Sequence, residues 1–102
     1  MKKQILIEKY IEPSEVEVKE IEARGGVVIK RWFDKYGDRH SFMGHPSVIY
    51  YNKDWQVIEQ YWHKKNQIHR NRTLPAYIFY ENGQIISQEF YTNGEFIKIK
   101  FY

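Results

Sequence analysis

Histidine, serine and carboxylate side chains could do acid–base chemistry in this chain, and they come closest together at Asp38, His40 and Ser41. In a catalytic triad, histidine takes the serine proton while a carboxylate orients the imidazole ring. Triad members usually come from distant parts of a chain, however, and no nucleophile elbow, phosphate-binding glycine loop or paired-carboxylate motif accompanies these three. We therefore expect a protein that is not an enzyme and has no catalytic residues.

The histidines could instead bind a metal ion. His40, His45, His63 and His69 follow one another at intervals of five, eighteen and six residues. These intervals match neither the i, i+2 spacing of one strand face nor the i, i+4 spacing of one helix face. The chain also has no cysteine, which excludes thiolate metal sites and disulfides. We therefore expect no metal and no other cofactor.

The charged and aromatic residues indicate binding rather than catalysis. The net charge is +3, but residues 24–72 alone hold ten lysines or arginines against four acids, a net charge of +6, and all four histidines. Cations are interleaved with rings at residues 30–33 and 61–65, a pattern typical of single-stranded nucleic-acid binding. The same pattern also arises when hairpin rings alternate with a solvated charged face. An anionic partner, whether nucleic acid or an acidic protein face, would meet this segment.

Aromatic side chains make up 18% of the chain, more than a domain of 102 residues can bury completely. Because exposed rings and arginines anchor interfaces, we expect a protein partner first, and a nucleic acid or ribonucleoprotein as the alternative. The predicted interface residues are tryptophans and cations of the basic segment, namely Trp32, Arg39, Trp55, Trp62, Lys64, Lys65, His69, Arg70 and Arg72. Strand parity puts Trp55 and Trp62 on opposite faces unless a bulge shifts the register.

The elements that must position these side chains form a repeat. Residues 46–51 read P-S-V-I-Y-Y and residues 75–80 read P-A-Y-I-F-Y, and the same offset of 29 carries Tyr61–Trp62 onto Phe90–Tyr91. The runs between are rich in residues that suit strands, and Asn-Gly pairs at 82–83 and 93–94 are strong hairpin signals. In the earlier copy, Lys53–Asp54 and Lys64–Lys65 take the place of these pairs, which predicts longer or less regular loops there.

The predicted fold is mainly β (α+β): one domain forming an antiparallel β-meander of repeated hairpins over residues 27–102, capped by residues 1–26. We expect strands at residues 4–11, 27–33, 47–51, 55–62, 76–80, 84–91 and 95–102. Ser14 with Glu17 forms a capping box, and Gly25–Gly26 follows Arg24, so a short helix is predicted over residues 15–24. The alternation of Val16 and Val18 favours a strand instead.

The last predicted strand and the amino terminus bear on the partners. Residues 95–102 form a sheet edge that is open to strand addition, by a partner protein or by a second copy in a homodimer, although Lys98 and Lys100 could guard it. The apolar run at residues 5–7 is too short for a signal peptide or a membrane span. We therefore expect a cytoplasmic protein with no membrane contact.

Residues about 27–96 resemble MORN-like repeats of the YwqK antitoxin type. The later copy carries the match in Ile68–Arg70, residues 75–80, Asn82–Gly83, residues 89–91 and Asn93–Gly94. The usual His-Arg pair stands at His69–Arg70 and is inverted at Arg39–His40. The resemblance implies antiparallel hairpins, a protein partner and no catalytic residues.

The expected function is that of a protein-binding module that inhibits or neutralises a macromolecular target. It could be an antitoxin, or a phage or mobile-element anti-defence protein of the anti-CRISPR type. A basic inhibitor of that second type would bind acidic protein surface or the guide nucleic acid. The alternative function is direct binding of single-stranded nucleic acid.

Overall fold

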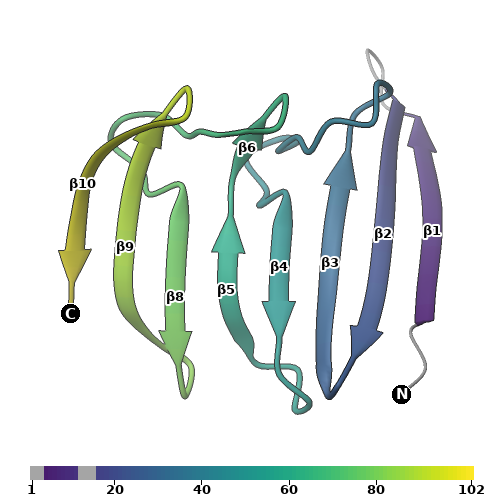
Figure 1. Cartoon of the computed structure of the whole chain (residues 1–102), viewed down its shortest axis with the longest axis horizontal. Coiled ribbons are helices and arrows are strands. Elements are labelled where there is room, and N and C mark those ends of the chain that lie inside the picture. Colours follow the sequence, from purple (N-terminus) through teal and green to yellow (C-terminus); the bar gives the residue numbers. More distant parts are fainter. Residues whose placement is uncertain (1–3, 12–15) are drawn as a thin grey trace.

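The computed structural model describes residues 4–11 and 16–102, which form ten strands and, within these ranges, no helix (Figure 1). Eight strands make one sheet in the order β1-β2-β3-β4-β5-β8-β9-β10, and β6 with β7 forms a separate two-stranded ribbon. The strands are β1 (Gln4–Ile11), β2 (Val16–Arg24), β3 (Val27–Phe33), β4 (Val48–Tyr51), β5 (Val57–Tyr61), β6 (His63–Lys64), β7 (Gln67–Ile68), β8 (Tyr77–Glu81), β9 (Gln84–Thr92) and β10 (Glu95–Phe101).

The predicted antiparallel meander is confirmed, because every neighbouring pair of strands in the large sheet is antiparallel. β1 and β3 have the predicted ranges, and the other predicted strands differ from the observed ones by one or two residues at their ends. In the described part of the chain, no helix could span a membrane.

The predicted helix over residues 15–24 is wrong. Val16–Arg24 is strand β2, which pairs with β1 on one side and with β3 on the other, while residues 14 and 15 lie outside the described residues. Gly25 and Gly26, interpreted as the end of that helix, instead form the turn between β2 and β3. Their φ angles of 60° and 82° are those of a two-residue hairpin turn, which needs left-handed conformations that glycine adopts without strain.

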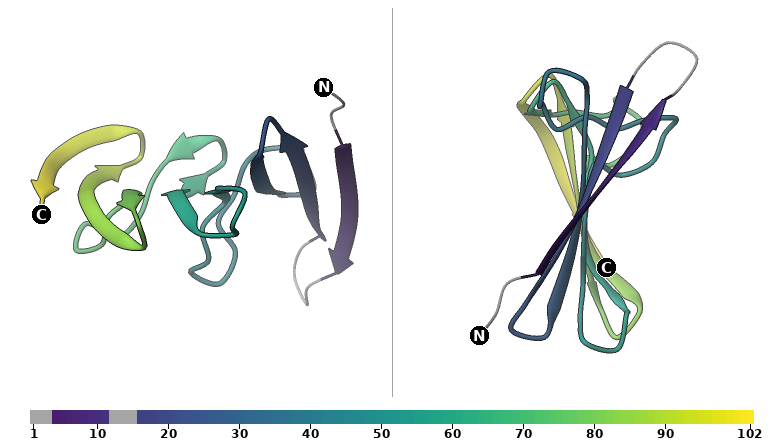
Figure 2. Two further views of the ribbon diagram at one scale, coloured as in Figure 1. Left: turned by 90° about the horizontal axis from the view of Figure 1, so that it is seen from below. Right: turned by 90° about the vertical axis from the view of Figure 1, so that its right-hand side faces the viewer.

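The sheet is a single twisted layer, which Figure 2 shows from two further directions. Its overall dimensions are 35 × 34 × 19 Å, and most strand side chains from β3 onward are only half-buried. Two long connections, residues 34–47 and 62–76, lie at one end of the sheet together with the turn at Asn93–Gly94 (Figure 1). We call this the loop end. The turns at residues 25–26, 52–56 and 82–83 lie at the opposite end, which we call the turn end.

A buried apolar cluster lies where the second connection meets the sheet. Trp62, Ala76 and Ile78 form this cluster, and half-buried rings and aliphatic side chains from β7, β8 and β9 pack against it. Because a single-layer sheet has no second layer to cover its faces, the connections take that role at the loop end. The conformation of the connections therefore depends on the same side chains that form the core.

The two copies of the repeat are equivalent in structure, but their offset changes from 29 to 28 within the unit. Ser47 N–H bonds to Tyr61 O as Ala76 N–H bonds to Glu89 O. The change arises in the turns, because five residues separate the paired Tyr51 and Val57 whereas four separate Tyr80 and Ile85. The turn at residues 52–56 is thus longer, as predicted.

This change of offset moves the second half of each unit by one residue. Trp62 is equivalent to Phe90, and not to Tyr91 as the uniform offset predicts. Both side chains are buried, Trp62 with 5% and Phe90 with 6% of its surface exposed. The prediction of a less regular loop at Lys64–Lys65 is wrong for the same reason. The turn is Lys65–Asn66, and its φ angles of 47° and 69° match the 49° and 83° of Asn93–Gly94.

Candidate binding surface at the loop end

Two equivalent histidines hold the loop end together. His40 Nδ1 accepts the main-chain N–H of Lys65 at 3.4 Å, and His69 Nδ1 accepts that of Asn93 at 2.8 Å. Each histidine thus fixes the two-residue turn of the next unit. Since Nδ1 accepts, the proton of each neutral ring is on Nε2. Burial and the nearby Lys64 lower the pKa of His69, which favours this neutral form.

The order Arg39–His40 inverts the usual His-Arg pair in the sequence, but the histidine keeps its equivalent position in the structure. Asn66 N–H bonds to Arg39 O as Gly94 N–H bonds to Ile68 O. Arg39 is thus equivalent to Ile68, and His40 to His69. The earlier unit has an arginine where the later one has an isoleucine, which adds a cation to the loop end.

Positive charge is concentrated in the second connection, since residues 62–76 include four lysines or arginines and no acid. The two acids of the first connection are engaged in local bonds. Asp34 is buried and accepts the N–H groups of Tyr36 and Asp38, while Asp38 accepts the side-chain amide of Asn66 at 2.7 Å. The two connections therefore present cations with little competing negative charge.

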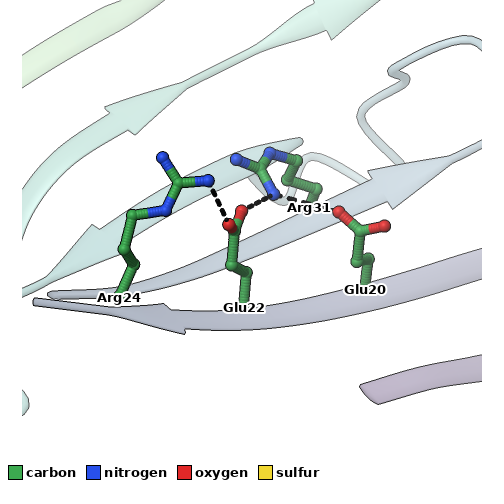
Figure 3. Close-up of polar contacts among 4 residues, drawn as sticks. All are labelled: Glu20, Glu22, Arg24 and Arg31. Carbon is green, nitrogen blue, oxygen red and sulfur yellow. Dashed lines mark hydrogen bonds and ion pairs between the residues drawn. The ribbon is translucent and has the colours of Figure 1, made fainter. Parts of the chain in front are cut away.

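Other cations of the basic segment are neutralised on the sheet, as Figure 3 shows. Arg31 Nη1 lies 2.9 Å from Glu20 Oε1 and 2.8 Å from Glu22 Oε1, and Arg24 Nη2 lies 2.8 Å from Glu22 Oε2. Burial lowers the pKa of Arg31, but hydrogen bonds to Glu22 and Glu20 outweigh burial and raise it overall. The net charge of residues 24–72 thus understates how much the charge of the sheet differs from that of the loop end.

A hollow of about 390 Å³ opens between the two connections. We call it the loop-end hollow. Its ionisable lining groups are all basic, and its other lining residues are polar or apolar. The residues that line it are His40, His63, His69, Lys64, Arg70, Ser41, Asn71, Gly44, Trp62 and Leu74.

Arg70 and Trp62 form a stacked pair within the loop-end hollow. The guanidinium carbon of Arg70 lies 3.9 Å from the centroid of the indole ring, and Arg70 Nη1 donates to Pro75 O at 3.1 Å. Trp62 Nε1 donates to Gly44 O at 3.0 Å, which ties the indole to the first connection. The described residues give Arg70 no ion pair. A cation held this way is preorganised to meet an anionic group.

A buried serine–histidine pair stands beside the loop-end hollow. Ser47 Oγ and His63 Nδ1 are 2.6 Å apart, and Ser47 Oγ also donates to Tyr61 O at 3.1 Å. When the hydroxyl proton bonds to that carbonyl, the neutral His63 ring donates its Nδ1 proton to Ser47. Burial and the charge of Arg39 lower the pKa of His63 to about 4, so the ring is neutral near pH 7.

This pair has a structural role, and its serine is not positioned for nucleophilic attack. Ser47 has no exposed surface, so its hydroxyl group cannot reach a substrate. Sequence reasoning missed the pair. Its signal is the correct alignment of the repeat, in which Ser47 and His63 take the places of Ala76 and Tyr91.

Asp38, His40 and Ser41 do not form a triad. Asp38 bonds to Asn66, His40 to the main chain of Lys65, and Ser41 Oγ accepts the N–H of His63. Each side chain is thus held by a partner outside the three. Among the residues that the structure describes, no three histidine or acidic side chains lie close enough together to hold a metal ion.

The loop end brings together most, but not all, of the predicted interface residues. Trp62, Lys64, His69 and Arg70 line the hollow, although Trp62 is a core residue and not an exposed anchor. The other cations in the prediction are exposed on the same connections, namely Arg39, Lys65 and Arg72.

The remaining two tryptophans lie elsewhere. Trp55 is 60% exposed in the turn at residues 52–56 at the turn end, with a φ of 62°. Because it lies in a turn, the strand-parity prediction does not apply to it. Trp32 is half-buried in β3, with Lys19 Nζ 6.0 Å from its ring. Sequence reasoning also missed Tyr36, which is 70% exposed at the loop end.

Comparisons with protein-family models, with curated proteins and with solved structures find no match to this chain, so the resemblance to MORN-like repeats stays a prediction.

Proposed function

We propose that this chain is a non-enzymatic binding module that inhibits or neutralises a protein target, and that its loop end contacts an acidic surface of that target. The observation that carries the proposal is the loop-end hollow, whose ionisable groups are all basic. An antitoxin and a phage anti-defence protein of the anti-CRISPR type are two forms that such an inhibitor takes.

The distribution of rings favours a protein partner over a nucleic acid. A site for single-stranded nucleic acid needs exposed rings beside its cations, so that bases can stack on them. Here Trp62 is buried, and the exposed Trp55 lies at the opposite end of the sheet from the cationic connections. Flat acidic protein surface needs only cations in complementary positions, and the loop end supplies these.

Site-specific photocrosslinking in the native host tests this proposal. A crosslinking amino acid at Lys64 should capture a defined protein, whereas the same amino acid at Lys53, exposed at the turn end, should not. Changing Arg39 and Lys65 to glutamate in the Lys64 crosslinker should weaken the capture, because like charges would then face each other. Equal capture from both positions, or no protein captured from either, would contradict the proposal.

One observation supports the alternative, direct binding of single-stranded nucleic acid. The exposed Tyr36 ring has Lys35 Nζ 5.3 Å and Lys65 Nζ 5.5 Å from its centroid, a ring between two cations. A salt titration with single-stranded DNA and RNA decides the matter. Nucleic-acid binding would be supported if the affinity fell steeply with salt and if Tyr36→Ala lowered it further. The absence of binding at low salt would exclude this alternative.

A further inference from the structure

Strand β10 forms an edge of the sheet. It pairs with β9 on one side, and no described strand pairs with its other side. Four of the eight exposed large hydrophobic side chains in the described part of the chain lie on this strand or directly after it, namely Phe96, Ile99, Phe101 and Tyr102. An exposed edge with such side chains is a template for an added strand.

A bulge sorts the side chains of this edge by type. Phe96 pairs with Tyr91, Ile99 with Glu89 and Phe101 with Ser87, and the register shifts between Phe96 and Lys98. Because Ser87, Glu89 and Tyr91 alternate along β9, their three partners share one face of the sheet. Strict alternation along the strand would put Phe96 on the face of the lysines, and the bulge moves it to the opposite face.

The other face of the same edge carries two cations. Lys98 pairs with Phe90 and Lys100 with Gln88, so both lysines lie on the face opposite Phe96, Ile99 and Phe101. Lys98 Nζ lies 4.8 Å from the Phe90 ring centroid and Lys100 Nζ 5.2 Å from that of Tyr102. Within the described residues, neither lysine has an ion pair. The edge is thus apolar on one face and positive on the other.

This arrangement disfavours a second copy of the chain as the occupant. Antiparallel pairing of two β10 strands that keeps both Lys98 and Lys100 within the ladder centres on Lys98 or on Ile99. The first register sets Lys98 against Lys98, and the second sets Lys98 against Lys100. Like charges directly opposite each other across a ladder are destabilising.

We propose that β10 accepts an antiparallel strand from a partner protein, an extended segment with carboxylates at alternate positions and apolar residues between them. The carboxylates would face Lys98 and Lys100, and the apolar residues would continue the row of Phe96, Ile99 and Phe101. Main-chain hydrogen bonds supply the affinity in this mode, and the alternating side chains supply the specificity.

The start of β10 offers room for the end of such a strand. A hollow of about 500 Å³ lies there, lined by one cation and one acid, Arg72 and Glu95, together with Thr92, Asn93, Phe96 and Ile97. An antiparallel strand would reach it with its carboxyl-terminal residues, where Arg72 presents a further cation. This surface is separate from the loop-end hollow and does not depend on the function proposed there.

Short peptides test the proposal by NMR titration of the whole protein. The probe is acetyl-T-V-E-V-E-V-T-amide, and the comparison peptides carry lysine in place of glutamate or N-methyl groups on alternate residues. The acidic peptide should shift the amide signals of β10 and leave those of the turn at residues 52–56 in place. The basic peptide should bind at least about tenfold more weakly, and N-methylation should abolish binding because it removes main-chain donors.

A charge-reversed variant provides the second arm. Lys98→Glu with Lys100→Glu should reverse the preference between the acidic and basic peptides, whereas Lys53→Glu at the turn end should leave it unchanged. Both lysines of β10 are exposed, so the fold should tolerate the change. Equal binding of the two peptides, binding that survives N-methylation, or no shift in β10 would overturn the proposal. Concentration-dependent dimerisation through β10 would overturn it too, in favour of a second copy.

Discussion

His63 Nδ1 and the hydroxyl oxygen of Ser47 share a buried hydrogen bond of 2.6 Å, in the place where the next unit of the repeat has Tyr91 and Ala76. The first unit thus has a buried polar pair where the second has a phenol and a methyl group. A buried histidine must be neutral to remain in this position, because burial penalises its charged form.

Acid should therefore destabilise the protein through His63. Its pKa falls from 6.5 in the unfolded chain to about 4 in the folded one, so between these values the unfolded state binds more protons. The contribution of the neutral ring is present above pH 6.5 and is lost as the pH falls through about 4. It amounts to as much as about 3 kcal/mol of unfolding free energy.

Urea unfolding at a series of pH values measures this loss. The double variant Ser47→Ala with His63→Tyr copies the later unit and should flatten the pH dependence between these limits. His45→Gln, which changes an exposed histidine of the first connection, should leave it as in the parent protein. A double variant that is as sensitive to acid as the parent would show that His63 is not the cause.

The histidine bonds that fix the turns should show in hydrogen exchange. His69→Ala removes the acceptor of the Asn93 N–H, and should cost about 1 kcal/mol of unfolding free energy. The Asn93 amide should then exchange faster than in the parent protein, while amides of the turn at residues 52–56 keep their rates. Exchange at Asn93 that does not change would mean that the Nδ1 bond contributes nothing to the turn.

The hairpins could be predicted from the sequence because their turns have a local cause. Asn82–Gly83 and Asn93–Gly94 have positive φ at both residues, as a two-residue hairpin turn requires. The helix over residues 15–24 failed because Ser14 and Glu17 mimic a cap, whereas tertiary pairing with β1 and β3 decides the conformation of Val16–Arg24.

The candidate site was less predictable than the fold, because it depends on contacts between units. The basic connections could be recognised from composition, since charge is a property of the segment. The burial of Trp62 could not be recognised from the sequence. One extra residue in the turn at residues 52–56 makes Trp62 equivalent to Phe90 and not to Tyr91. The pairs Ser47–His63 and His69–Asn93 join residues at least 16 positions apart, and no local pattern announces them.

Trp62 and Trp55 are both predicted interface residues, and the effects of their substitution on the unfolding free energy should differ. Trp62→Ala removes a buried ring from the core and should cost about 4 kcal/mol of unfolding free energy, whereas Trp62→Phe, which copies Phe90, should cost about 1.5 kcal/mol or less. Trp55→Ala, at an exposed turn position, should change the unfolding free energy by no more than about 0.5 kcal/mol. Thermal and urea unfolding of the three variants measure these values. Similar losses for Trp55→Ala and Trp62→Ala would contradict the assignment of Trp62 to the core.

The ion pairs of the sheet should differ in strength according to their burial. Glu22 is 3% exposed and bridges Arg24 and Arg31, whereas the side chain of Glu20 is 25% exposed and, among the described residues, forms an ion pair with Arg31 alone. Glu22→Gln removes the charge of the buried partner and should cost about 2 kcal/mol of unfolding free energy, while Glu20→Gln should cost about 0.5 kcal/mol. Salt should reduce the smaller effect more, because water and ions screen exposed pairs and reach buried ones poorly. Urea unfolding of both variants at low and high salt gives the comparison, and a larger loss for Glu20→Gln would contradict the arrangement in Figure 3.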